Sequence, residues 1–190
     1  MNLARIICAT VFLAAIPAAA FAADEIIDAI DQARKAYQAG DMANAKQSLD
    51  LASQLIGQKN AESFAALLPP PLPGWKADQA QAKAIGAAMF GGASNASRNY
   101  TNAKGDTVEV SITGDSAIIM QFAPMLTNPA LAGAMGKLIR VGDQRGIQTT
   151  DGNVMMLVAN KFMVQVQGSA DAAAKLSYAQ AVDIAKLSKM

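Results

Sequence analysis

Hydrophobic residues recur at intervals of three or four in two stretches, over 24–39 and from residue 41 into the sixties, as on one face of an α-helix. The two stripes consist of Ile26, Ile30, Ala33 and Tyr37, and of Ala45, Leu49, Ala52 and Ile56. Between them, Gly40 is a helix stop and Asp41 is a suitable cap for the next helix. We predict an antiparallel helical hairpin over 24–68, whose second helix stops near Gly57 and resumes through Phe64.

The run from Leu67 to Trp75, with the sequence LLPPPLPGW, ends this helical period. Proline fixes φ and lacks an amide donor, so four prolines within five residues continue neither a helix nor a central strand. We predict a stiff, extended proline-rich linker over 69–75, with Trp75 anchoring it to the domain that follows.

Beyond Trp75, most of the chain alternates between apolar and polar residues with the period of two that is typical of half-buried strands. In the stretch Thr107 to Thr113, for example, Val108, Val110 and Ile112 share one face. Further strands are expected at 93–101, 137–141, 146–150, 154–159 and 162–167, with tight turns at 151–152 and 160–161.

Helices are expected over the alanine-rich residues 78–90 and over 116–126, 129–135 and 171–182. In the last of these, Leu176, Ala179 and Val182 point inward. The sequence therefore predicts an α+β domain over 76–190. This domain is an antiparallel sheet of about five or six strands with helices packed on one face.

Residues 1–23 combine a basic start at Arg5, an apolar run from Ile6 to Ala19 and the small-residue motif Ala20-Phe21-Ala22. This order is typical of a secretory signal peptide, and the apolar run is too short to span a bilayer comfortably. We expect cleavage after Ala22 or Ala23 and export to the periplasm, leaving no stable membrane span. A retained N-terminal anchor is the alternative.

Charge and composition narrow the functions that remain. The formal charge is +1, and removal of Arg5 with the signal leaves 15 basic against 15 acidic residues, which disfavours nucleic acid as a partner. Histidine is absent and Cys8 is the only cysteine. A chain without either after cleavage lacks the usual zinc ligands, a histidine-activated nucleophile and a disulfide, so we expect neither an enzyme nor a bound cofactor or metal.

The stretch Ala36-Tyr37-Gln38-Ala39-Gly40-Asp41, followed by Ala45, Leu49 and Ala52, resembles one tetratricopeptide-type unit. Such units pair a Gly-Asp turn with small residues where their two helices touch. No second copy follows at the expected period, so the resemblance implies a lone interaction unit with Tyr37 and Asp41 on its surface. The alternative is a plain hairpin that docks on its own domain or on a second copy.

The order of elements after the hairpin is similar in outline to the small exported domains of the PsbP/Mog1 type. The proline run with Gly74-Trp75 also resembles one found in exported proteins of Gram-negative bacteria. Both resemblances are general, and neither supplies functional residues.

Three arginines are candidate anion contacts, because guanidinium groups bind anions through bidentate hydrogen bonds: Arg98, Arg140 and Arg145. Arginines scattered over a half-polar sheet also form plain solvated faces. The methionines lack the clustering of a copper site and are read as core filler. Asp143, Asp151 and Asn153 lack the spacing of a calcium loop.

These observations favour an exported, non-enzymatic protein-interaction or scaffolding protein, whose partner is another envelope protein or a second copy of itself. The alternative is a binding protein for a small hydrophobic or lipid-like ligand, held between residues 116–135 and the sheet. A carboxylate-based enzyme is a third hypothesis, resting on the pairs Asp106 with Glu109 and Asp143 with Asp151.

Overall fold

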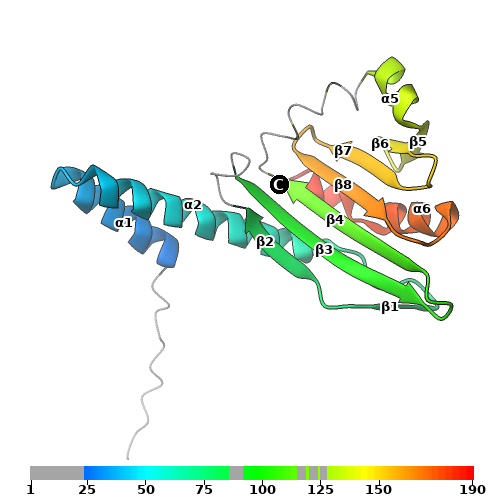
Figure 1. The fold of residues 1–190 in the computed structure, drawn as a ribbon, viewed down its shortest axis with the longest axis horizontal. Coiled ribbons are helices and arrows are strands. Elements are labelled where there is room, and N and C mark those ends of the chain that lie inside the picture. Colours follow the sequence, from blue (N-terminus) through cyan, green and yellow to red (C-terminus); the bar gives the residue numbers. More distant parts are fainter. Residues whose placement is uncertain (1–23, 86–91, 115–118, 120–123, 125–127) are drawn as a thin grey trace, which may run out of the picture.

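The computed structural model of the 190-residue chain describes residues 24–85, 92–114, 119, 124 and 128–190. Two helices, α1 (Glu25–Gln38) and α2 (Met42–Ala65), form a hairpin that projects from one side of a twisted sheet (Figure 1). The expected signal peptide lies outside the described residues, as do most of the helix expected over 116–126 and the end of the one expected over 78–90. No helix of the described part is long and apolar enough to cross a membrane.

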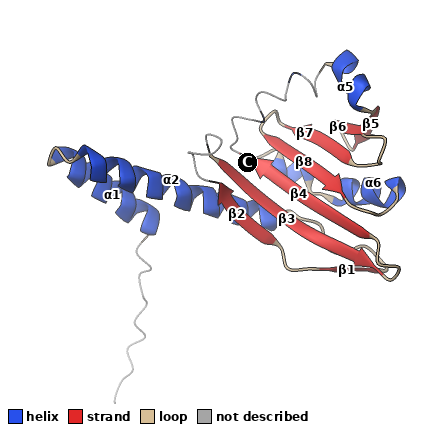
Figure 2. Ribbon diagram, in the orientation of Figure 1, coloured by secondary structure: helices blue, strands red, loops and turns tan. Residues whose placement is uncertain are grey.

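The sheet is antiparallel throughout and has eight strands, more than the five or six expected (Figure 2). Its order is β1-β3-β4-β8-β7-β6-β5, and β2 also pairs with β3. The strands are β1 (Trp75–Ala77), β2 (Gln81–Ile85), β3 (Ala93–Asn102), β4 (Thr107–Gly114), β5 (Lys137–Val141), β6 (Gln144–Gln148), β7 (Val154–Val158) and β8 (Phe162–Gln167). The predicted α+β class is therefore confirmed.

The helix predicted over the alanine-rich residues 78–90 is wrong for its described part. Residues Gln81–Ile85 form β2, which pairs with β3 from Gln81 opposite Ser97 to Ile85 opposite Ala93. Exposure alternates along the strand: Gln81 and Lys83 are exposed, whereas Ala82 and Ala84 are partly buried. The ten-residue β3 offers an edge long enough for both β1 and β2, and this pairing overrides the helical propensity of alanine.

Helix α2 is continuous over 24 residues, so the interruption predicted near Gly57 is wrong. The glycine is explained by close approach of the helix to β2. A Cβ at position 57 would lie 3.2 Å from Cβ of Ala84. The C-terminal half of α2 therefore packs on the sheet domain, while its N-terminal half packs on α1.

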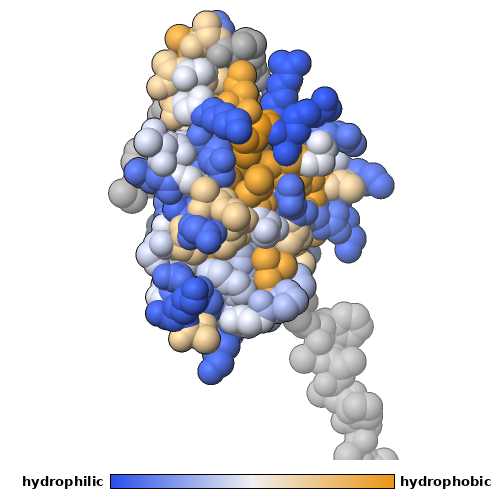
Figure 3. All heavy atoms as spheres, turned by 90° about the vertical axis from the view of Figure 1, so that its right-hand side faces the viewer, coloured by the Kyte–Doolittle hydropathy of each residue, from blue (hydrophilic) through white to orange (hydrophobic). Residues whose placement is uncertain are grey.

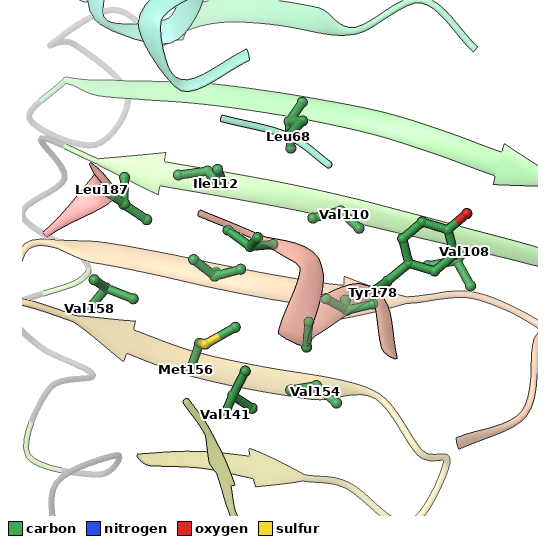
Figure 4. Close-up of a cluster of buried hydrophobic side chains, with 14 of the residues drawn as sticks. Leu68, Val108, Val110, Ile112, Val141, Val154, Met156, Val158, Tyr178 and Leu187 are labelled. Atoms are coloured by element: carbon green, nitrogen blue, oxygen red, sulfur yellow. The ribbon is translucent and has the colours of Figure 1, made fainter. Parts of the chain in front are cut away.

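One face of the sheet carries the core (Figure 4). Val108, Val110 and Ile112 of β4 are fully buried, as the alternating pattern predicted. Helices α6 (Ala172–Ala181) and α7 (Ile184–Leu187) cover this face, and Tyr178 of α6 lies over the β4 valines. Phe64, from the end of α2, packs edge-to-face on Phe162 at a centroid distance of 5.5 Å.

The last four strands form the predicted meander, and α5 (Pro129–Met135) precedes them. The turn between β7 and β8 places Ala159 and Asn160 at positive φ, one residue earlier than the predicted pair. Asp171 caps α6 by accepting a hydrogen bond from the amide of Ala174 at 2.7 Å, as expected for the closing helix.

Candidate functional surfaces

The fully buried residues between the two hairpin helices are all alanines. Ala29 and Ala33 of α1 and Ala45 and Ala52 of α2 are buried. Alanine removes little apolar area from water, so this contact is a close one with a modest hydrophobic contribution. The predicted helical stripes are present, but their alanines alone are buried.

Most large apolar side chains on or beside the same stripes remain exposed. The exposed fractions range from 42% for Ile30 to 64% for Tyr37. These residues define the apolar face of the hairpin: Ile27, Ile30, Tyr37, Met42, Leu49 and Ile56. Isolated exposed apolar residues are ordinary in proteins, but a contiguous group marks an interaction surface.

The six residues lie on one side of the hairpin, because a polar groove occupies the other side. This groove of about 580 Å³ runs between the helices and is lined by Gln32, Ala36, Asn44, Gln47, Ser48, Asp50, Leu51 and Gln54. At 100° per residue, Gln32 and Ile30 lie on opposite flanks of Ala33. Asn44 and Leu49 likewise lie on opposite flanks of the buried alanines of α2. The groove residues of both helices share one side, so the apolar residues share the other.

The two surface residues singled out in the sequence have different roles here. Tyr37 belongs to the apolar face. Asp41 caps α2, accepting hydrogen bonds from the amide of Asn44 at 3.1 Å and from its Nδ2 at 2.6 Å. These hydrogen bonds lower the pKa of the Asp41 carboxyl, because they favour its charged form.

The proline-rich linker is held against the sheet domain by two tyrosines. The hydroxyl of Tyr100 donates to the carbonyl oxygen of Pro69 at 2.6 Å, and the amide of Leu72 donates to the hydroxyl of Tyr178 at 3.2 Å. The two tyrosine rings lie 4.4 Å apart. Burial raises the pKa of Tyr100 to about 12, although the nearby guanidinium of Arg98 acts in the opposite direction. Burial also raises the pKa of Tyr178.

Trp75 anchors the linker as predicted, by packing edge-on against Tyr178 at 5.4 Å. Arg98 adds a longer hydrogen bond from Nη1 to the carbonyl of Pro69 at 3.4 Å. The sequence reasoning did not single out either tyrosine. A signal was present, because a buried tyrosine needs a partner for its hydroxyl and a proline run offers free carbonyl acceptors.

Only two of the three candidate anion-binding arginines lie side by side. Arg98 lies on β3, on the core side of the sheet, and four strands separate it from β5. Arg140 of β5 and Arg145 of β6 are direct cross-strand partners, and both are exposed. Neither makes an ion pair within the described residues. Like charges in this position repel, which makes the pair a candidate contact for an anion.

Beside this pair, a hollow of about 210 Å³ lies between the ends of β6 and β7. Arg145 and Asp143 line it together with apolar Ile147, Met155 and Leu157. The side of the molecule that carries β5, β6 and α5 shows hydrophobic residues framed by hydrophilic ones (Figure 3). The hollow is smaller than the ~300–1,000 Å³ of typical ligand pockets, so it would hold only part of a ligand.

Lys175 of α6 is a buried lysine, only 2% exposed. Its Nζ donates to the carbonyl of Asp151 at 2.7 Å and to Oδ1 of Asn153 at 2.9 Å. The ammonium thereby holds the β6–β7 turn, where Gly152 at φ +76° packs against Ala172 with no room for a Cβ. These contacts give Asp151 and Asn153 a structural role in the turn.

Two of the four candidate catalytic carboxylates accept hydrogen bonds from neighbouring side chains. Asp106 accepts from Nδ2 of Asn102 at 2.8 Å in the β3–β4 turn, and Glu109 accepts from Nε2 of Gln167 at 2.8 Å. Within the described residues, no three acidic side chains gather as a metal site would require.

The chain was compared with known proteins. No protein-family model, curated protein or solved structure matches it.

Proposed function

We propose that this chain is an exported, non-enzymatic protein-interaction or scaffolding protein of the periplasm, and that the hairpin is its interaction module. The observation that carries the proposal is the apolar face on a hairpin that projects from the sheet domain (Figure 1). An apolar surface of this extent is costly to leave in water and is typical of a binding surface. The linker, fixed by Tyr100, Tyr178 and Trp75, holds the hairpin at a defined position.

The sharpest test leaves the fold intact. Deleting the hairpin would remove Phe64 and Leu68 from the core, so surface substitutions are preferable. Ile30→Glu with Leu49→Glu places two charges on the apolar face, while Gln32→Glu with Gln47→Glu places them on the polar side of the same helices. We expect crosslinking and affinity capture from the periplasm to recover a defined partner with the wild-type chain and with the polar-side variant, but not with the apolar-face variant. Equal capture by all three would overturn the assignment of the hairpin.

A second candidate function is binding of a small hydrophobic or lipid-like ligand. The hollow between β6 and β7 supports it, because apolar Ile147, Met155 and Leu157 stand beside the guanidinium of Arg145. That combination suits the junction of an acyl chain and an anionic head group. Most of residues 116–126, where the sequence favoured a ligand-covering helix, lies outside the described part of the chain.

Native mass spectrometry of the freshly purified chain tests this alternative. Co-purifying mass that is lost in Arg145→Gln, and retained in Lys186→Gln on helix α7, which does not line the hollow, would favour ligand binding over scaffolding. A spectrum containing only the bare chain would eliminate it.

A further inference from the structure

We infer that the apolar face of the hairpin binds the same face of a second copy of this chain, forming a four-helix contact between two hairpins. This inference rests on the proposed interaction function and names the partner. It follows from the composition, the charge and the area of the face.

The spacing of the face suits packing against more helices. Met42, Leu49 and Ile56 follow one another at intervals of seven residues along α2, and Ile30 and Tyr37 do so along α1. A seven-residue spacing keeps apolar side chains on the seam of left-handed helix packing, which is the geometry of coiled coils and four-helix bundles. Both helices contribute, so two identical faces can pair by a twofold rotation.

The charges beside the face do not oppose pairing of identical copies. Arg34 pairs with Asp31 at 3.0 Å on α1, and Lys46 pairs with Asp50 at 2.7 Å on α2. Each basic residue near the face is therefore neutralised within its own helix. Two such faces meet without the like-charge repulsion that would discourage self-association.

The area is adequate for a dimer. Six large side chains, each about half exposed, together present roughly 600 Å², compared with about 800 Å² per partner in a standard interface. Neighbouring alanines and polar side chains would add the remainder. The helix α1 has α2 as its main neighbour in one copy, so a second copy would bury its otherwise open side.

The inference is tested by measuring mass in solution. The measured chain, residues 24–190, contains every described element and lacks Cys8, so disulfides between copies cannot form. Its mass is measured by light scattering and sedimentation velocity. We expect the wild type and Gln32→Glu/Gln47→Glu to be dimers. In Ile30→Glu/Leu49→Glu, the dissociation constant should rise by at least about 100-fold, because buried unpaired carboxylates are strongly unfavourable. Unchanged circular dichroism would show that each variant is folded.

Single cysteines locate the contact independently. A short bismaleimide should link Leu49→Cys into covalent dimers far more readily than Gln47→Cys on the opposite side. The inference would be overturned if the wild type stayed monomeric at high concentration. It would also be overturned if the apolar-face variant and the polar-side variant weakened the dimer equally. A monomeric wild type that still loses a captured envelope protein through the apolar-face variant would leave the proposed function standing. A wild type that neither dimerises nor captures any partner would remove the proposed function as well.

Discussion

The sheet domain and the hairpin use apolar residues in opposite ways. In the sheet domain the valines, isoleucine and tyrosines of β3, β4 and α6 are buried, and alanines fill the tighter positions. In the hairpin, Ala29, Ala33, Ala45 and Ala52 are buried, whereas the six large side chains of the apolar face stay exposed. A helical stripe in a sequence therefore predicts a contact surface without indicating whether that surface is covered within the same chain.

The largest expected contrast is between two aliphatic side chains of similar size. Ile112→Ala should lower the free energy of unfolding by about 2–5 kcal/mol, because Ile112 is fully buried and its loss leaves a cavity. Leu49→Ala should change it by less than about 0.5 kcal/mol at concentrations too low for association. Urea denaturation measures both, and similar losses would contradict the assignment of Leu49 to an open face.

A second contrast compares two lysines. Lys175→Met should cost about 1.5–3 kcal/mol, since the carbonyl of Asp151 and the amide oxygen of Asn153 lose a charged donor. Lys46→Met removes an exposed ion pair with Asp50 and should cost at most about 0.5 kcal/mol. Thermal unfolding of the two variants gives the comparison. An unchanged midpoint for Lys175→Met would show that the β6–β7 turn is held by other contacts.

Tyrosines provide a third, smaller contrast. Tyr100→Phe keeps the ring and removes the hydrogen bond to Pro69, so we expect a loss of about 0.5–1.5 kcal/mol. Tyr37→Phe, on the exposed hairpin face, should have no measurable effect on unfolding. Proteolysis within residues 69–75 should also become faster in Tyr100→Phe alone. Equal protection of the linker in both variants would rule out the proposed role of the hydroxyl.

The final comparison is between the wild type and Tyr100→Phe, whose unfolding free energies should depend differently on pH only at high pH. The folded-state pKa of Tyr100 is about 12, above the ordinary value near 10, so the folded chain retains a proton that the unfolded chain releases. This contribution to stability is complete below pH 10 and is lost as the pH rises toward 12. The unfolding free energy of the wild type should therefore fall more steeply over that window than that of Tyr100→Phe. Parallel profiles would contradict the raised pKa.

Most strands of the sheet domain could be predicted from the sequence, because apolar and polar residues alternate within each of these short segments. Val108, Val110 and Ile112 alternate, and they face the core. The strand Gln81–Ile85 was mistaken for a helix because alanine favours helices, and only the long edge of β3 explains its pairing. The strand order, which separates Arg98 from Arg140 and Arg145, depends on contacts between distant segments and has no local signal.

The apolar face of the hairpin and the anchored linker likewise combine features with a local sequence signal and features that depend on contacts between distant segments. The two helical stripes, the stop at Gly40, the cap at Asp41 and the proline run could be recognised without a structure, because local backbone preferences and residue spacing are properties of short segments. Long-range packing determines that the small residues of those stripes are buried while most of the large ones are exposed, and that Tyr100 and Tyr178 hold the linker. The physical reason is that burial depends on which distant surface comes to lie against a residue.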